Sequence, residues 1–244
     1  MIKILSYLFF FIVTLQLSSV LAELQLSCRK CSMQDSECLT REGQDLLKQF
    51  VNGFPESRVE KLDELFIDTI EINTDGVDQE LQNVKISGLR NAKLNDLSFD
   101  NTFNLVRLSF DANLTTNAEY TLDGVLFRQP IVGTGTTTYI IKNIQMDMLI
   151  FYNIVENENG KHTLKIRRYR SGFTIKDGVE YQYNNLYKGD KKKSDIVHAL
   201  LNKNWVTITS VFGNKFYNKI FDKIFEALQA FTRSHDLEDL FLYP

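Results

Sequence analysis

The chain has 244 residues, a formal net charge of −3, 43% hydrophobic and 12% aromatic residues, and only 3 prolines. This mildly acidic balance excludes a basic nucleic-acid-binding surface, and the apolar content excludes a disordered chain. Residues 1–22 join Lys3 to an apolar core and end in Val20-Leu21-Ala22, which predicts a secretory signal peptide. An uncleaved membrane anchor is the alternative, although the apolar core is short for a span. No low-complexity linker follows, so we expect a single secreted, extracellular domain over residues 23–244.

The cysteines gather near the expected mature start, at Cys28, Cys31 and Cys38. In an oxidising compartment this number predicts one disulfide and one remaining thiol, with the pairing left open by the spacing. The three histidines lie far apart in the sequence and form no ligand pair. We therefore predict no metal site and no cofactor.

A moderate helix is predicted over 37–51, because leucines recur among polar residues and the segment ends at Asn52-Gly53. Alternation of apolar and polar residues then predicts strands. Their expected ranges are 67–73, 81–87, 94–99, 105–110, 120–127, 131–152, 163–169 and 173–183. Asn113 opens an Asn-Leu-Thr sequon, which we expect on a surface turn between two strands and predict to be glycosylated.

The segment 131–152 stands out as one long strand without proline. At about 3.3 Å per residue it would extend up to about 70 Å. Gly133 and Gly135 are the positions where we expect a bulge or tight bend, which a sheet needs if it is to curl.

The segment 194–231 carries apolar residues at spacings of mostly three and four, which predicts one long amphipathic helix. A continuous helix of this length would measure about 57 Å, so the molecule is expected to be elongated. Charged and amide residues interrupt any run of about 20 apolar residues, which excludes a membrane span here. Gly213 is the expected place for a bend or a break.

Catalytic patterns are missing from the sequence. No nucleophile elbow occurs, and the Gly133-Thr134-Gly135 segment lacks the third glycine of a dinucleotide fingerprint. We therefore predict that the protein is not an enzyme. Aromatic residues and methionines on the long helix and strands suit the wall of an apolar ligand site, but the same residues would also fill an ordinary core.

Several short motifs, in order along the chain, resemble the insect takeout and juvenile hormone binding protein family. They are the cysteine pair spaced as in 31–38, the segment from Gly-Phe-Pro to Leu-Asp-Glu-Leu at 53–65, and the Tyr, Leu and Gly pattern of 120–135. Asn-Leu-Tyr-Lys-Gly-Asp-Lys followed by Leu-Asn-Lys-Asn-Trp, within 185–205, is the closest match, and 237–241 fits the family's ending. The second disulfide of the moth hormone carriers has no counterpart, which favours the broader takeout branch.

The resemblance implies an α+β fold in which a long C-terminal helix is wrapped by a highly curved antiparallel β-sheet around an internal apolar tunnel. It implies a Cys31–Cys38 disulfide, and a carrier that binds a terpenoid such as juvenile hormone, or a fatty acid-like lipid, without stable membrane insertion. The alternative is a membrane-surface lipid-binding protein of the bactericidal/permeability-increasing type. For the ligand-binding wall we predict Leu201, Trp205, Ile208, Phe212, Phe216, Phe127, Tyr139 and Met146.

Overall fold

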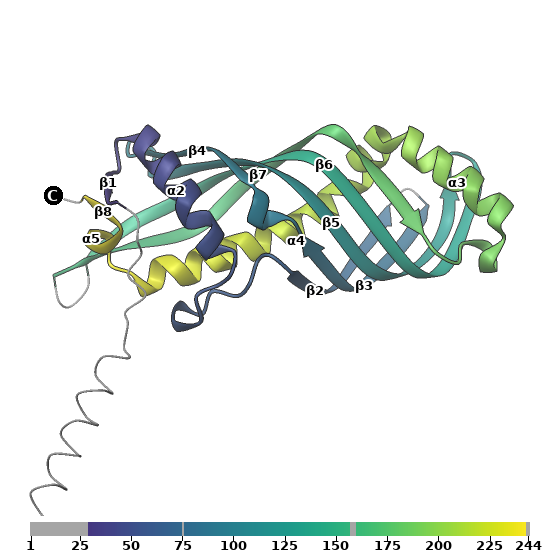
Figure 1. Cartoon of the computed structure of the whole chain (residues 1–244), viewed down its shortest axis with the longest axis horizontal. Coiled ribbons are helices and arrows are strands. Elements are labelled where there is room, and N and C mark those ends of the chain that lie inside the picture. Colours follow the sequence, from purple (N-terminus) through teal and green to yellow (C-terminus); the bar gives the residue numbers. More distant parts are fainter. Residues whose placement is uncertain (1–28, 75, 157–159, 243–244) are drawn as a thin grey trace, which may run out of the picture.

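The computed structural model describes residues 29–74, 76–156 and 160–242 (Figure 1). The predicted signal peptide and Cys28 lie outside the described residues. The molecule is elongated, and one curled sheet wraps a long helix that runs along most of its length. This is the predicted α+β architecture.

The sheet is antiparallel throughout and has the order β2-β3-β5-β6-β7, with β4 also paired to β5. Its strands are β2 (Leu65–Thr74), β3 (Val77–Ser87), β4 (Lys93–Asp100), β5 (Leu105–Leu126), β6 (Gln129–Glu156) and β7 (His162–Tyr183). The predicted long strand is confirmed as β6, which has 28 residues.

Two predicted strand boundaries are wrong. The segments 105–110 and 120–127 belong to one strand, β5, and 163–169 and 173–183 belong to one strand, β7. The polar residues between the first pair resemble a turn in sequence, but they alternate outward while Ala112, Leu114 and Ala118 face the core. A strand with one wet face needs no turn to place such residues in water.

Register shifts mark where the sheet bends. The β5–β6 ladder shifts at Asn113 and the β6–β7 ladder shifts beside Asn143. The Asn143 backbone N–H donates to Asn113 Oδ1 at 2.8 Å, and Asn143 Nδ2 donates to Asp177 Oδ2 at 2.9 Å. Bulges increase local twist, and aligned bulges on neighbouring strands help the sheet curl. Asn113 therefore lies exposed in a bulged strand and not on a turn.

The predicted bend at Gly133 and Gly135 is also misplaced, because both lie in paired β6. At both glycines another part of the protein packs so closely against the backbone that a side chain would not fit. A Cβ on Gly135 would lie 2.7 Å from the Asn184 carbonyl oxygen, and one on Gly133 would lie 2.6 Å from the Tyr120 hydroxyl.

The prediction of one continuous helix over 194–231 is wrong. The structure has α3 (Lys191–Lys203) and α4 (Trp205–Ser234), which meet at Asn204 with φ −108° and ψ 26°. Asn204 Nδ2 donates to the Leu200 carbonyl at 2.7 Å, and side-chain bonds of this kind compete with helical ones. Gly213 stays inside α4, where an added Cβ would lie 3.2 Å from the Phe173 ring.

Two helices tie down strand edges at opposite ends of the molecule. At one end is the predicted helix α2 (Ser36–Phe50), whose Gln44 donates to the Ala92 carbonyl at 3.1 Å and accepts from the Leu94 N–H at 2.6 Å. At the other end, Asn202 of α3 accepts from the Tyr181 N–H at 2.7 Å. Side-chain amides thus satisfy strand-edge groups that would otherwise need water or another strand.

The first and last strands of the described chain pair with each other beside α2. Strand β1 (Cys31–Ser32) pairs in parallel with β8 (Phe241–Leu242), which follows α5 (Leu237–Leu240). A disulfide joins Cys31 to Cys38 of α2. The β1 and α5–β8 segments therefore lie at the same end of the fold (Figure 1).

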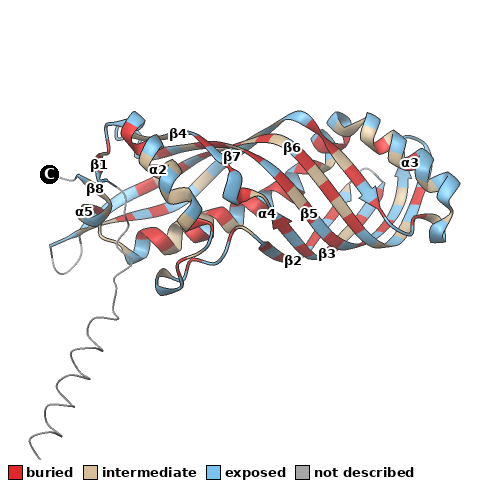
Figure 2. Cartoon of the chain, viewed as in Figure 1, coloured by how far each residue is buried: buried red, intermediate tan, exposed pale blue. Residues whose placement is uncertain are grey.

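The core lies between α4 and the concave face of the sheet. Figure 2 shows buried positions alternating along the strands and following one side of α4. The apolar stripe predicted for this helix is confirmed by buried Ile208, Phe216, Ile220, Ile224 and Phe231.

Candidate functional site

Two cavities lie between α4 and the concave face of the sheet, and they have no lining residue in common. Cavity 1, of about 60 Å³, lies toward α3, against residues 208–217 of α4. Cavity 2, of about 280 Å³, lies under α2, against residues 224–232 of α4. The two cavities therefore occupy opposite halves of the same helix.

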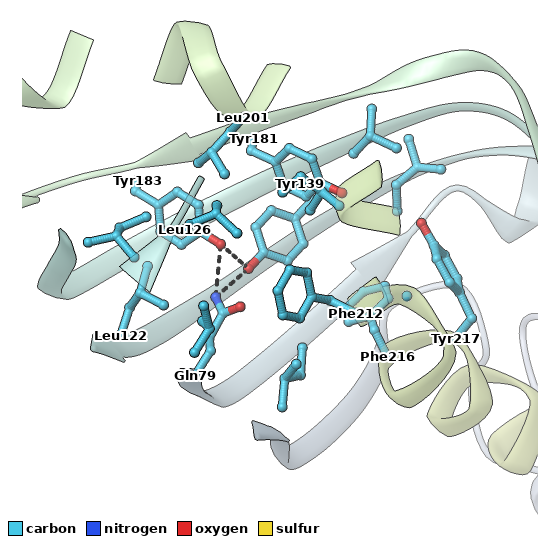
Figure 3. Close-up of a pocket in the computed structure, with 17 residues that line it drawn as sticks. Gln79, Leu122, Leu126, Tyr139, Tyr181, Tyr183, Leu201, Phe212, Phe216 and Tyr217 are labelled. Carbon is cyan, nitrogen blue, oxygen red and sulfur yellow. Dashed lines mark hydrogen bonds between the residues drawn. The ribbon is translucent and has the colours of Figure 1, made fainter. Parts of the chain in front are cut away.

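Cavity 1 is apolar apart from a few hydroxyl and amide groups, and no charged side chain lines it (Figure 3). Strands β2, β3, β5, β6 and β7 form one wall, and α3 and α4 form the other. Tyr139, Tyr181 and Tyr183 come from neighbouring strands, because Tyr139 pairs with Tyr181 in the β6–β7 register. Their rings pack edge to face, with centroids 5.2 Å apart for Tyr139 and Tyr181 and 5.8 Å apart for Tyr139 and Tyr183.

A triangle of hydrogen bonds joins three polar side chains in this cavity (Figure 3). Gln79 Nε2 lies 2.7 Å from the Tyr139 hydroxyl and 2.9 Å from the Tyr183 hydroxyl, and the two hydroxyls lie 2.7 Å apart. Burial raises the pKa of both tyrosines well above the usual value, so both hydroxyls stay neutral. Burial also raises the pKa of Tyr181, to about 12, while its hydroxyl lies 3.3 Å from Thr209 Oγ1.

Cavity 2 has a different lining. Aliphatic and aromatic side chains from α2, β4, β5, β6, β7 and α4 surround it, among them Leu46, Leu94, Phe110, Ile150 and Leu228. The charged residues of its lining are Arg29 and Lys30, which precede β1, Glu42 of α2 and Asp239 of α5. Apart from these four residues and Thr232, the lining is apolar.

A packed layer lies between the two cavities along β6 and α4. Ile144, Met146, Met148, Ile220 and Phe221 all have 0% exposure, and none of them lines either cavity. The apolar space that was expected as a tunnel therefore takes the form of two chambers with a filled middle.

The sequence matches the family described as haemolymph juvenile hormone binding protein (JHBP) over residues 8–242. The chain belongs to this family. Circadian clock-controlled protein daywake of Drosophila melanogaster is 27% identical over 192 residues, which cover 74% of each chain. Juvenile hormone-binding protein of Manduca sexta is 31% identical over 96 residues, covering 38% of this chain and 42% of that protein.

The solved structure of Epiphyas postvittana Takeout 1 has the same fold as this JHBP-family chain. The two superpose with a TM-score of 0.86 at 27% identity, over 88% of this chain and 99% of Takeout 1. The resemblance to the takeout and juvenile hormone binding family, read from short motifs, is thereby confirmed.

Of the wall residues predicted for this JHBP-family member, five line cavity 1. They are Tyr139, Leu201, Ile208, Phe212 and Phe216. The helix spacing found four of them, because one face of α3 and α4 continues across the break at Asn204.

The other three predicted wall residues line neither cavity. Trp205 begins α4, and its indole Nε1 lies 3.6 Å from where a Cβ of Gly178 would stand. Phe127 lies at the β5–β6 turn with φ 51° and 39% of its surface exposed. Met146 belongs to the packed layer, because strand alternation gives the inward direction of a residue but not its depth.

Sequence reasoning missed Gln79 and the whole of cavity 2. Tyr181 and Tyr183 did carry a signal, since they alternate on one face of a strand that ends beside α3. In the described part of the chain, no helix is long and apolar enough to cross a membrane.

Proposed function

We propose that this protein is a secreted carrier that binds a small hydrophobic ligand non-covalently, a terpenoid such as juvenile hormone or a fatty acid-like lipid, with cavity 2 as the main chamber. The observation that carries the proposal is an apolar cavity of about 280 Å³ between α4 and the sheet, separated from the smaller cavity 1 by a packed layer.

An unfilled cavity of this size is expensive. At about 24 cal/mol per Å³, a cavity of 280 Å³ that was enclosed and empty would cost about 7 kcal/mol. The whole stability of a typical domain is roughly 5–15 kcal/mol. Natural cores contain few voids larger than a water molecule, so a space this large and apolar favours an occupant of matching chemistry.

The comparisons support the same function. The family is described as haemolymph juvenile hormone binding protein, and the Manduca sexta relative is named juvenile hormone-binding protein. Affinity would come from apolar burial at about 25 cal/mol per Å², without catalytic residues, metal or cofactor.

Secretion is part of the proposal. The N-terminal 22 residues have the pattern of a cleaved leader, and a disulfide suits an oxidising compartment. Asn113 is exposed on the outer side of the sheet, where a glycan would meet solvent, and we propose it as a glycosylation site.

The test is direct analysis of bound lipid. Protein purified from its native secretion is extracted and examined by mass spectrometry, and a fluorescent fatty-acid probe is displaced by candidate ligands. The proposal predicts a co-purifying apolar species and saturable probe binding. If no apolar species is extracted and the probe does not bind, the carrier function is wrong. Binding to vesicles that weakens with salt, in place of probe binding, would support a membrane-surface protein.

A further inference from the structure

The triangle formed by Gln79, Tyr139 and Tyr183 has unused hydrogen-bonding capacity. It supplies four hydrogens, two from the amide and two from the hydroxyls, and its three contacts use three of them. These three contacts leave one hydroxyl hydrogen over: on Tyr139 it would have the Thr137 side chain as a further partner, and on Tyr183 it has no other partner among the described residues. Gln79 Oε1 accepts no hydrogen bond from any described residue.

The amide orientation follows from the same count. If Gln79 were turned so that Oε1 accepted from both tyrosines, the two hydroxyl oxygens 2.7 Å apart would have no hydrogen between them. With Nε2 facing both tyrosines, each of the three contacts holds a hydrogen. Gln79 Oε1 then lies on the other side of its amide from the triangle (Figure 3).

These groups are deeply buried. Gln79, Tyr139 and Tyr183 have 8%, 5% and 8% exposure. Among the described residues, the side-chain atom that is fully buried without a partner is Thr116 Oγ1, so Gln79 Oε1 keeps some accessible surface. A donor and an acceptor without protein partners in the wall of cavity 1 favour a ligand that supplies both.

Charge decides which ligand groups fit. No lysine, arginine or histidine lines cavity 1, so an ionised carboxylate would lose its hydration without gaining a counter-ion. The tyrosines stay protonated because burial raises the pKa of both, so they act as neutral donors. The space of about 60 Å³ admits a group of a few atoms and not a whole lipid.

We infer that cavity 1 is a recognition site for the neutral oxygen-bearing end of an apolar ligand, above all a hydroxyl group, and that it rejects a free carboxylate. The hydroxyl accepts from the spare tyrosine hydrogen and donates to Gln79 Oε1. This inference rests on the proposed carrier function and narrows its ligand class to neutral lipids.

The experiment compares three ligands with the same chain length, hexadecanol, palmitic acid and hexadecane, as competitors of a fluorescent apolar probe at neutral pH. Hexadecanol is expected to bind at least about 10-fold more tightly than either of the others, the factor that one buried hydrogen bond of about 1.4 kcal/mol supplies. Tyr139→Phe is expected to reduce that preference by lowering the affinity for hexadecanol, because it breaks two of the three contacts that hold the polar groups in place.

Two further variants keep the test decisive. Tyr169→Phe is the matched control, because its hydroxyl bonds Asp222 at 2.6 Å outside both cavities, and it is expected to keep the preference. Gln79→Met removes the amide and is expected to lose the preference, even if Tyr139→Phe fails to fold.

The inference is wrong if the wild-type protein binds the alcohol and the acid equally, or if Gln79→Met and Tyr139→Phe keep the preference for the alcohol. A protein that binds the probe without this discrimination remains a carrier. A protein that binds neither the probe nor any of the three ligands overturns both proposals.

Discussion

The two ends of this molecule are built alike and lined differently. At each end a helix uses a side-chain amide to hold a strand edge, Gln44 on β4 and Asn202 on β7. The cavity beside α2 is large and mostly apolar, whereas the cavity beside α3 is small and contains a triangle of tyrosine and glutamine hydrogen bonds.

In the proposed carrier, the large apolar cavity 2 supplies affinity for a hydrophobic ligand, and the polar groups of cavity 1 supply selectivity. Apolar area stabilises any hydrophobic guest, since the hydrophobic effect has no direction. Buried hydroxyl and amide groups distinguish guests strongly, because a ligand without matching groups leaves them unpaired. A single long fold can therefore offer bulk burial at one end and chemical discrimination at the other.

A variant that fills cavity 2 tests most directly whether this cavity supplies most of the affinity for an apolar ligand. Leu228→Trp places a larger side chain from α4 into cavity 2. We expect the affinity for an apolar probe to fall about 100-fold, or about 2.7 kcal/mol, because the probe loses its space. Probe titration measures the loss. Val211→Trp, at a more exposed position of the same helix, serves as the control. Unchanged affinity in Leu228→Trp would mean that the probe binds elsewhere.

Removing the disulfide tests whether the end of the molecule that contains cavity 2 is stabilised independently of the end that contains cavity 1. Replacing both Cys31 and Cys38 by serine opens an eight-residue loop and is expected to lower the free energy of unfolding by about 2.5 kcal/mol. Denaturant unfolding gives the loss, and hydrogen exchange gives its location. We expect faster exchange in α2, with β7 beside α3 unchanged. Faster exchange at both ends alike would show that the ends are coupled.

The two strand-edge contacts allow a matched pair of variants. Asn202→Ala leaves the Tyr181 N–H without its acceptor, and Gln44→Ala does the same to the Leu94 N–H. Each is expected to lower the free energy of unfolding by about 2 kcal/mol, the cost of an unpaired buried group. Amide exchange at residue 181 should then rise only in Asn202→Ala, and amide exchange at residue 94 should rise only in Gln44→Ala. A rise at residue 94 in Asn202→Ala would contradict separate ends.

The periodicity of apolar residues within short segments predicted most of the helices and strands. The candidate site depends instead on contacts between residues that lie far apart in the sequence. The stripe of α4 was readable because Ile208, Phe216 and Ile220 repeat with the helix period. Asn204 gave no such signal, since its break depends on a side-chain bond to the Leu200 carbonyl and on the packing of α3 against β7. The strand β5 was divided because its outward polar residues look like a turn when the neighbouring strands are unknown.

The site was less predictable than the fold. Gln79 lies 60 residues from Tyr139 and 104 from Tyr183, and only the curl of the sheet brings the three together. Cavity 2 collects residues from 29 to 241, so no local period describes it. Helix spacing predicted one wall of cavity 1 because the same apolar face continues from α3 into α4.

Alkaline titration compares the tyrosine-containing cavity 1 with cavity 2, and it is expected to give the smallest effect of these experiments. No tyrosine lines cavity 2, whereas Tyr181 in cavity 1 has its pKa raised from 10.0 to about 12 by burial. The neutral form is favoured in the folded state, so this contribution to stability is complete below about pH 10 and is lost as the pH rises toward 12. Over that window Tyr181 should lower the free energy of unfolding by about 1.4 kcal/mol per pH unit. Denaturant unfolding between pH 9 and pH 12 is expected to give a shallower fall for Tyr181→Phe than for the wild-type protein. Leu228→Trp should keep the wild-type slope, because it alters only the cavity without tyrosines. Equal slopes for the wild-type protein and Tyr181→Phe would mean that the Tyr181 hydroxyl is hydrated in solution, and the contrast between a dry polar cavity and an apolar one would be lost.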